Sequence, residues 1–124
     1  MKLLFSLLLS LLALTSFRAH AQDKAKTSGT TQLQVKTSAV CEMCKARLEK
    51  AMAYEKGVQA ASLDVPTQML TITYRPGKTD AGKLRTAVRQ TGYDADDQLA
   101  EARAYERLPD CCKKTNAIHT DSGH

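Results

Sequence analysis

The stretch "SAVCEMCKARLEKAM", residues 38–52, decides how this chain is organised. It places Cys41 and Cys44 at the point where an irregular segment gives way to a helical pattern. Leu48 and Met52 follow Cys44 at intervals of four residues, which gives a helix with one apolar face. The cysteine pair is therefore expected at the beginning of a helix that packs on a core. The pair itself suits a redox switch, a structural disulfide or a metal site.

Three strands are predicted around this helix. Before it, Leu33 and Val35 alternate with polar residues, which is the pattern of a half-buried strand. After it, alternating patterns at 58–65 and 69–75 are separated by a short turn, which predicts a hairpin.

A second helix and a last strand complete the predicted domain. Asp80 is a good N-cap for a helix whose apolar face is formed by Leu84 and Val88 and which ends at Gly92. The segment "YDA" at 93–95 is predicted to be a fourth strand. The order β-α-β-β-α-β predicts an α+β, ferredoxin-like fold over residues 31–96. Two helices would cover one face of a four-stranded antiparallel sheet.

Residues 97–124 are predicted to form a different kind of segment. An apolar spacing indicates a short third helix that stops before Pro109, formed around Leu99, Ala102, Tyr105 and Leu108. The rest of this C-terminal extension is polar, and we expect it to be mobile.

The N-terminus is typical of an exported protein. Residues 1–21 combine an early lysine, a short apolar block and the ending Ala-His-Ala, which predicts a signal peptide cleaved after Ala21. Residues 22–30 are polar and are predicted to be a flexible leader. The apolar block is short for a membrane span and no second one follows. We therefore expect a periplasmic or secreted protein without stable membrane insertion.

The charge and composition exclude several functions. The formal charge is +5, and removing Lys2 and Arg18 with the signal peptide leaves 16 basic and 13 acidic residues, or +3. These charges are spread out and alternate in sign, whereas a nucleic-acid-binding protein would show a clustered basic surface. No catalytic triad, carboxylate pair or phosphate-binding glycine loop is evident, so no enzymatic activity is expected.

The chemistry of Cys41 and Cys44 can be argued from their position. Residues three apart at the start of a helix face the same side, so the two sulfur atoms can converge. The helix N-terminus favours thiolate over thiol, Lys45 and Arg47 add positive charge, and Glu42 opposes them. Two thiolates select thiophilic ions and suit Cu(I) before Zn(II), which prefers four ligands. A partner's thiolate could then take the ion by ligand exchange.

Two other functions remain open on spacing alone. An exported protein with four cysteines usually forms disulfides, which would make this an inert structural or interaction module. A disulfide closing so short a loop would, however, contribute little stability. A thiol-disulfide oxidoreductase is the other alternative. It would usually carry an aromatic residue before the first cysteine and Gly-Pro inside the motif, where this chain has Val40 and Glu42-Met43.

Residues 31–95 resemble a heavy-metal-associated domain, the fold of copper chaperones, of copper-ATPase modules and of periplasmic mercury-binding proteins. The resemblance rests on these segments: "LQVKT", "CEMC", "KARLEKAM", Gly57-Val58, "LDV", "LTITYRP" and "LRTAVRQTGYDA". It implies that Cys41 and Cys44 are the metal ligands and that Tyr93 lies close to them. The implied cargo is Cu(I), with Hg(II) or Zn(II) as alternatives. The implied partners are a metal donor or acceptor protein, such as a transporter or efflux component, and the protein would be a monomer or a metal-bridged dimer.

The sequence departs from the family pattern in two places. Ser38, Ala39 and Val40 replace the usual Gly-Met-x before the first cysteine, so a less rigid loop is expected. The extension adds further candidate ligands, which with Met43 and Tyr93 are auxiliary to the pair: Cys111, Cys112, His119 and His124. Adjacent cysteines either form a strained vicinal disulfide or add thiolates to an ion held by the pair.

Overall fold

The computed structural model describes residues 29–120. The predicted signal peptide, residues 22–28 of the predicted leader, and His124 lie outside this range. Within it, no helix is long and apolar enough to cross a membrane.

A three-stranded antiparallel sheet forms one layer of the domain. Its strands are β1 (Thr31–Lys36), β2 (Val58–Asp64) and β3 (Met69–Tyr74), in the spatial order β1-β3-β2. Ile72 of the central strand pairs with Leu33 on one side and with Ala61 on the other. The strand positions agree with the predicted alternation.

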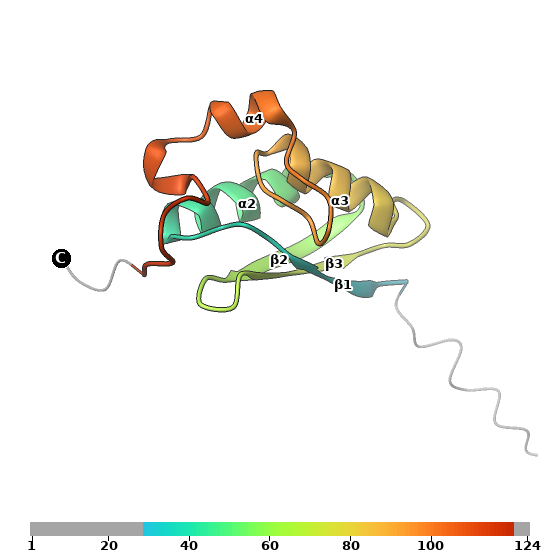
Figure 1. The fold of residues 1–124 in the computed structure, drawn as a ribbon. Helices are drawn as coiled ribbons and strands as arrows, with labels where there is room; N and C mark the ends of the chain where they lie inside the picture. The colour runs from blue at the N-terminus through green and yellow to red at the C-terminus, as the bar shows by residue number, and fades with distance from the viewer. Residues whose placement is uncertain (1–28, 121–124) are drawn as a thin grey trace, which may run out of the picture.

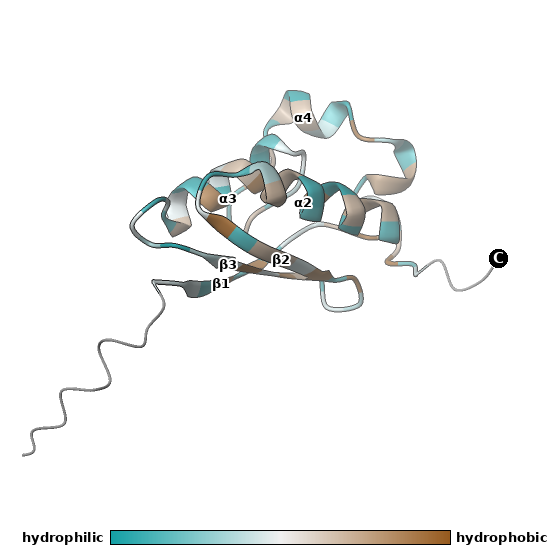
Figure 2. Ribbon diagram, turned by 180° about the vertical axis from the view of Figure 1, so that it is seen from behind, coloured by the Kyte–Doolittle hydropathy of each residue, from teal (hydrophilic) through white to brown (hydrophobic). Residues whose placement is uncertain are grey.

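Two helices form the other layer. Helix α2 (Glu42–Tyr54) and helix α3 (Ala81–Gln90) lie on the same face of the sheet, as two opposite views show (Figure 1 and Figure 2). The core between the layers is made of residues that the sequence pattern had placed on the inner faces. Its fully buried members include Val35, Leu48, Met52, Leu70, Ile72, Leu84 and Val88.

The helix ends follow the predicted caps in part. The Asp80 side chain accepts a hydrogen bond from the Lys83 backbone N–H at 2.9 Å, as expected of an N-cap. Gly92 follows α3 with a φ of +108°, a conformation that glycine adopts readily. Helix α2 ends at Tyr54, and the Glu55 backbone N–H donates to the Met52 carbonyl at its end.

The outer edge of β2 is covered by two side chains of α2. Glu49 accepts a hydrogen bond from the Leu63 N–H at 2.9 Å, and Lys45 donates one to the Leu63 carbonyl at 3.0 Å. Lys45 and Glu49 also pair with each other. These contacts satisfy backbone groups that an edge strand would otherwise leave free.

The predicted fourth strand is not present in the described part of the chain. In the segment 93–95, only Ala95 makes strand-like contacts, which are two isolated bridges to Thr37 and to Gln98. The chain turns immediately afterwards, because Asp96 has a φ of +54° and Ala95 bonds to Gln98 across the turn. The Asp96 backbone and side chain bond to the Lys36 backbone, which fixes this turn beside β1.

The C-terminal extension is folded back on the domain, and the expectation of a mobile tail was wrong for residues 109–120. Helix α4 (Ala102–Glu106) is shorter than predicted, and it buries Ala104 rather than Ala102. Leu99 lies outside the helix and is exposed, while Leu108 is buried as predicted. A 3-10 turn, η1 (Asp110–Cys112), follows Pro109 and returns to the N-terminal end of α2 (Figure 1).

Gly92 allows this return, and Gly92→Ala should disturb it. A Cβ at this position would lie 2.9 Å from the Ala104 carbonyl oxygen and 3.0 Å from the Leu108 side chain. With the added strain of a positive φ, we expect the free energy of unfolding to fall by about 1–3 kcal/mol. Denaturant unfolding measures this effect. Gly77→Ala is the control, because a Cβ there meets nothing within 4 Å; an equal loss in both variants would contradict the argument.

Asp96→Asn should reduce stability at neutral pH and not in acid. The Arg85 guanidinium donates to the Asp96 carboxylate at 2.7 Å, and the Lys36 N–H also donates to this carboxylate. These two hydrogen bonds lower the pKa of Asp96 below its usual 3.8. The stabilisation is therefore fully present above pH 3.8 and is lost as the pH falls through the depressed pKa. Asparagine tolerates the positive φ.

Since this ion pair is about one third exposed, the stability difference at pH 7 should stay below about 1 kcal/mol. Urea unfolding at pH 7 and at pH 2.5, roughly one unit below the ordinary Asp pKa, measures it. A difference that persists unchanged in acid would rule out the charge as its cause.

Candidate metal centre

Cys41 and Cys44 are placed by the start of helix α2. Cys41 is the N-cap residue, with an extended backbone, and its Sγ accepts a hydrogen bond from the Cys44 N–H at 3.4 Å. The two Sγ atoms lie 3.1 Å apart and are not bonded to each other. The convergence expected from their spacing is thus observed, at the positive end of the helix dipole.

The loop before Cys41 is held by hydrogen bonds from several elements. The Asp94 N–H donates to Ser38 Oγ, the Gln68 side chain donates to the Ala39 carbonyl, and the His119 N–H donates to the Val40 carbonyl. Ala39 and Val40 are also buried. These contacts hold the loop although it lacks the usual Gly-Met-x residues before the first cysteine. The packing of the loop therefore does not support the expectation that it is less rigid.

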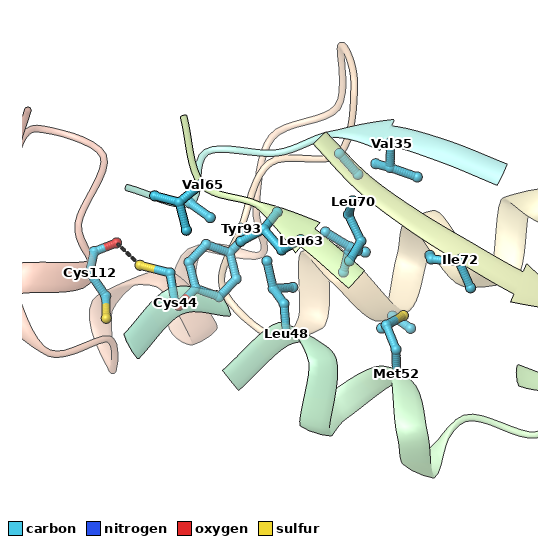
Figure 3. Packing of buried hydrophobic residues seen from close by; sticks show 14 of the residues in the cluster. Val35, Cys44, Leu48, Met52, Leu63, Val65, Leu70, Ile72, Tyr93 and Cys112 are labelled. Atoms are coloured by element: carbon cyan, nitrogen blue, oxygen red, sulfur yellow. Dashed lines mark hydrogen bonds between the residues drawn. The ribbon is translucent and has the colours of Figure 1, made fainter. Parts of the chain in front are cut away.

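The extension brings its two cysteines to the same place. Cys112 Sγ lies 3.8 Å from Cys41 Sγ, and Cys44 Sγ contacts the Cys112 carbonyl oxygen at 3.9 Å (Figure 3). Cys111 Sγ lies 4.0 Å from Cys112 Sγ and 3.9 Å from Met43 Sδ. The sulfur atoms of Cys41, Cys111 and Cys112 all lie within 4.8 Å of one another, a spacing that could hold a metal ion.

The four thiols differ in their access to solvent. Cys44 and Cys112 are fully buried, and Cys41 is 2% exposed. Cys111 is exposed, as is Met43 beside it. In the part of the chain that the structure describes, solvent therefore reaches the cluster only at Cys111 and Met43, while the other three thiols are buried.

Tyr93 lies against the cluster from the side of the core. Its ring is completely buried beside Cys44 (Figure 3). Its hydroxyl has no partner at ordinary hydrogen-bond distance among the described residues. Burial, together with the neighbouring Cys44 and Cys112 sulfurs, raises the pKa of the Tyr93 phenol. A buried hydroxyl that faces sulfur is suited to donate to a thiolate.

The surroundings favour negative charge on Cys44 rather than on its neighbours. Burial opposes ionisation of Cys44, but the polar groups around its sulfur, on the Val40 backbone, Cys41 and Tyr93, outweigh burial and lower its pKa. Burial raises the pKa of Cys41 and of Cys112, and hydrogen bonds to Cys44 add to this effect. The positive charge expected from Lys45 is engaged by Glu49, so hydrogen bonds and the helix terminus stabilise the thiolate.

The remaining candidate ligand in the described range is His119. Its backbone N–H donates to the Val40 carbonyl. Its ring is exposed, and the ring Nδ1 lies 2.9 Å from the Ala117 carbonyl oxygen. Among the described residues, the group whose ligand atoms lie close enough together to bind one metal ion consists only of cysteines. The structure therefore brings together all four cysteines, Met43 and Tyr93, and leaves the His119 ring outside.

Comparison with known proteins identifies this arrangement. Residues 36–94, which include both Cys41 and Cys44, match the heavy-metal-associated domain family. The chain contains a heavy-metal-associated domain. The predicted family resemblance is thereby confirmed, and Cys111 and Cys112 lie outside the matched residues.

The heavy-metal-associated domain is similar to part of much longer proteins. It is 38% identical over 66 residues to a copper-exporting P-type ATPase of Staphylococcus aureus strain JH9. That stretch is 53% of this chain but only 8% of the ATPase, so the likeness concerns one domain of the transporter.

Two solved structures share the fold at low sequence identity. A CopZ metallochaperone is 23% identical with a TM-score of 0.51, and covers 52% of this chain and 98% of its own. Oxidized MerP from Ralstonia metallidurans CH34 is 24% identical with a TM-score of 0.52, and covers 54% of this chain and 94% of its own. These neighbours support the ferredoxin-like α+β fold. Each covers little more than half of this chain.

Tyr93→Phe should raise the pKa of Cys44 without unfolding the domain. The phenol is one of the groups that lower this pKa, and its hydroxyl has no other partner among the described residues. The phenol hydroxyl can donate to the Cys44 thiolate and the phenylalanine ring cannot, so the pKa of Cys44 should rise in the variant. The NMR chemical shift of the Cys44 Cβ, followed against pH in the reduced protein, measures this rise. An unchanged or lower pKa would contradict this role for Tyr93.

Proposed function

We propose that this protein binds a thiophilic metal ion through Cys41 and Cys44 and transfers it to a partner. The observation that carries the proposal is the sulfur pair at the N-terminus of α2, inside a heavy-metal-associated domain. Thiolates at a helix N-terminus bind soft ions such as Cu(I), Hg(II) and Zn(II) in preference to hard ones.

Cu(I) is the preferred cargo in this proposal. It is satisfied by two thiolates, whereas a closed zinc site usually takes four ligands. The likeness to a domain of a copper-exporting ATPase supports this choice. Hg(II) and Zn(II) are the alternative cargoes, because thiolates also bind these thiophilic ions.

Transfer proceeds by exchange of ligands. A thiolate of the partner attacks the bound ion, a bond from the ion to Cys41 or Cys44 breaks, and the released thiolate takes a proton from water. The oxidation state of the ion does not change, so no catalytic group is needed. The partner is a metal donor or acceptor protein with its own exposed thiolates, such as a transporter.

We place this activity outside the cytoplasm. The support is the predicted signal peptide at residues 1–21 and the absence of a second long apolar segment in the sequence. The mature protein would work in the periplasm or after secretion, where metal must be loaded before the thiols are oxidised.

A thiol-disulfide oxidoreductase is the second candidate, because the two sulfurs are close enough to form a disulfide with little movement. A catalytic thiolate must, however, be reachable by a substrate disulfide. The thiol with the lowered pKa, Cys44, is fully buried, so a protein disulfide cannot approach it directly. A metal ion is smaller and can pass between neighbouring thiols from the exposed Cys111, which favours metal binding over disulfide exchange.

Cu(I) competition tests the proposal. The reduced chain under anaerobic conditions should withdraw Cu(I) from a chromophoric chelator, and Cys41→Ser with Cys44→Ser should lose most of that ability. Ala46→Ser is the matched control, since it introduces a serine at an exposed position of the same helix and keeps every thiol. Failure of the wild type to take copper, or retention by the double serine variant equal to wild type, would overturn the proposal.

An insulin-reduction assay tests the second candidate. The wild type should show no activity above that of the Cys41→Ser, Cys44→Ser variant. Activity that depends on the pair would instead establish the oxidoreductase.

A further inference from the structure

The two cysteines of the C-terminal extension are not needed by the proposed pair, yet they complete its surroundings. Cys112 is fully buried with its sulfur against that of Cys41, and the adjacent Cys111 is exposed to solvent. The turn that carries them is tied to the domain by the neighbouring His119 N–H bond to Val40. Leu108, which precedes the cysteines, is buried in the core, so contacts on both sides of the cysteines fix the position of this turn.

The sulfur spacings suit a three-coordinate ion. For a metal–sulfur bond of about 2.3 Å, trigonal coordination separates the ligand atoms by about 4.0 Å and linear coordination by about 4.6 Å. The Cys41–Cys112 distance is 3.8 Å and the Cys111–Cys112 distance is 4.0 Å. Cys111 and Cys41 complete the triangle within 4.8 Å.

The pair Cys41–Cys44 has a different spacing. Its sulfur atoms are 3.1 Å apart, so they must separate by about 1.5 Å to hold an ion in linear coordination. The triangle needs almost no movement. The cluster is thus arranged for three sulfur ligands around one point, and Cys41 and Cys44 must move apart slightly to hold an ion between them.

We propose that Cys41, Cys111 and Cys112 form a three-thiolate site for a thiophilic ion, which shares Cys41 with the Cys41–Cys44 pair. This inference rests on the proposed metal-binding function and extends it to the extension. Each thiol that binds releases one proton to water as its S–H bond is replaced by a sulfur–metal bond. The ion keeps its oxidation state.

The shared ligand gives the ion a path through the protein. Cys111 is the exposed thiol of the cluster, so an ion supplied from outside meets it first. Binding to Cys112 and Cys41 then draws the ion inward, and exchange of a tail thiolate for Cys44 moves it to the pair. Because Cys41 stays bound throughout, the ion never has to return to solvent. Release to a partner follows the same steps in reverse.

The experiment uses the full reduced chain loaded with one equivalent of Cu(I) under anaerobic conditions. X-ray absorption counts the sulfur neighbours of copper, and competition with a chelator measures retention. The wild type should show three sulfur neighbours. Cys111→Ser with Cys112→Ser should show two and retain copper less well. Asp110→Asn, which alters the same turn at a fully exposed side chain, should match the wild type.

Because Cys112 is buried, Cys112→Ser could disturb the fold, and a second variant avoids this problem. Cys44→Ser leaves the triangle intact, so it should still bind copper through three sulfurs. Complete loss of copper in Cys44→Ser would overturn the proposal, as would a wild type with only two sulfur neighbours. If the tail variant equals the wild type while Cys41→Ser with Cys44→Ser loses copper, the three-thiolate site is wrong and the pair stands. If the wild type takes no copper, both fail.

Discussion

The hydrogen bond from the Cys44 N–H to Cys41 Sγ is the contact on which the site depends. It makes Cys41 the N-cap of α2, a position that oxygen-bearing side chains usually fill. Sulfur is a weaker acceptor than oxygen, so the helix terminus keeps much of its capacity to stabilise negative charge. The sulfur atom of Cys41 therefore caps helix α2 and is also well placed to bind a cation at the helix N-terminus.

Burial decides what this arrangement does. Removing thiols from water disfavours their ionised form, which explains why the pKa of Cys41 and of Cys112 is raised. A bound soft cation offsets the negative charge that burial opposes, so the closed cluster favours metal thiolates over free ones. The extension produces this burial, and Gly92 allows the extension to approach because a side chain there would collide with Ala104 and Leu108.

The sequence predicted the parts of the fold that depend on local patterns. The three strands, the two main helices, the Asp80 cap and the meeting of Cys41 with Cys44 all follow from periodicity and spacing. The missing fourth strand was not predictable in this way. Whether "YDA" continues as a strand depends on the turn at Asp96 and its bonds to Lys36, which are long-range contacts.

The same limit applies to the extension. Its composition is polar, and polarity alone indicates a mobile tail, but a few contacts made by buried Leu108 and Cys112 are enough to fix it. The sequence did single out Cys111 and Cys112 as auxiliary ligands without indicating where they would lie. The pairing of a short turn with the loop before Cys41 appears only in the folded chain.

Both proposed sites use Cys41 as a ligand for a soft metal ion. Crystals of the reduced full chain, grown with Cu(I) and measured at the copper absorption edge, test this assignment. We expect one strong anomalous peak within bonding distance of Cys41 Sγ. A peak away from Cys41, or none in crystals that contain copper, would contradict it.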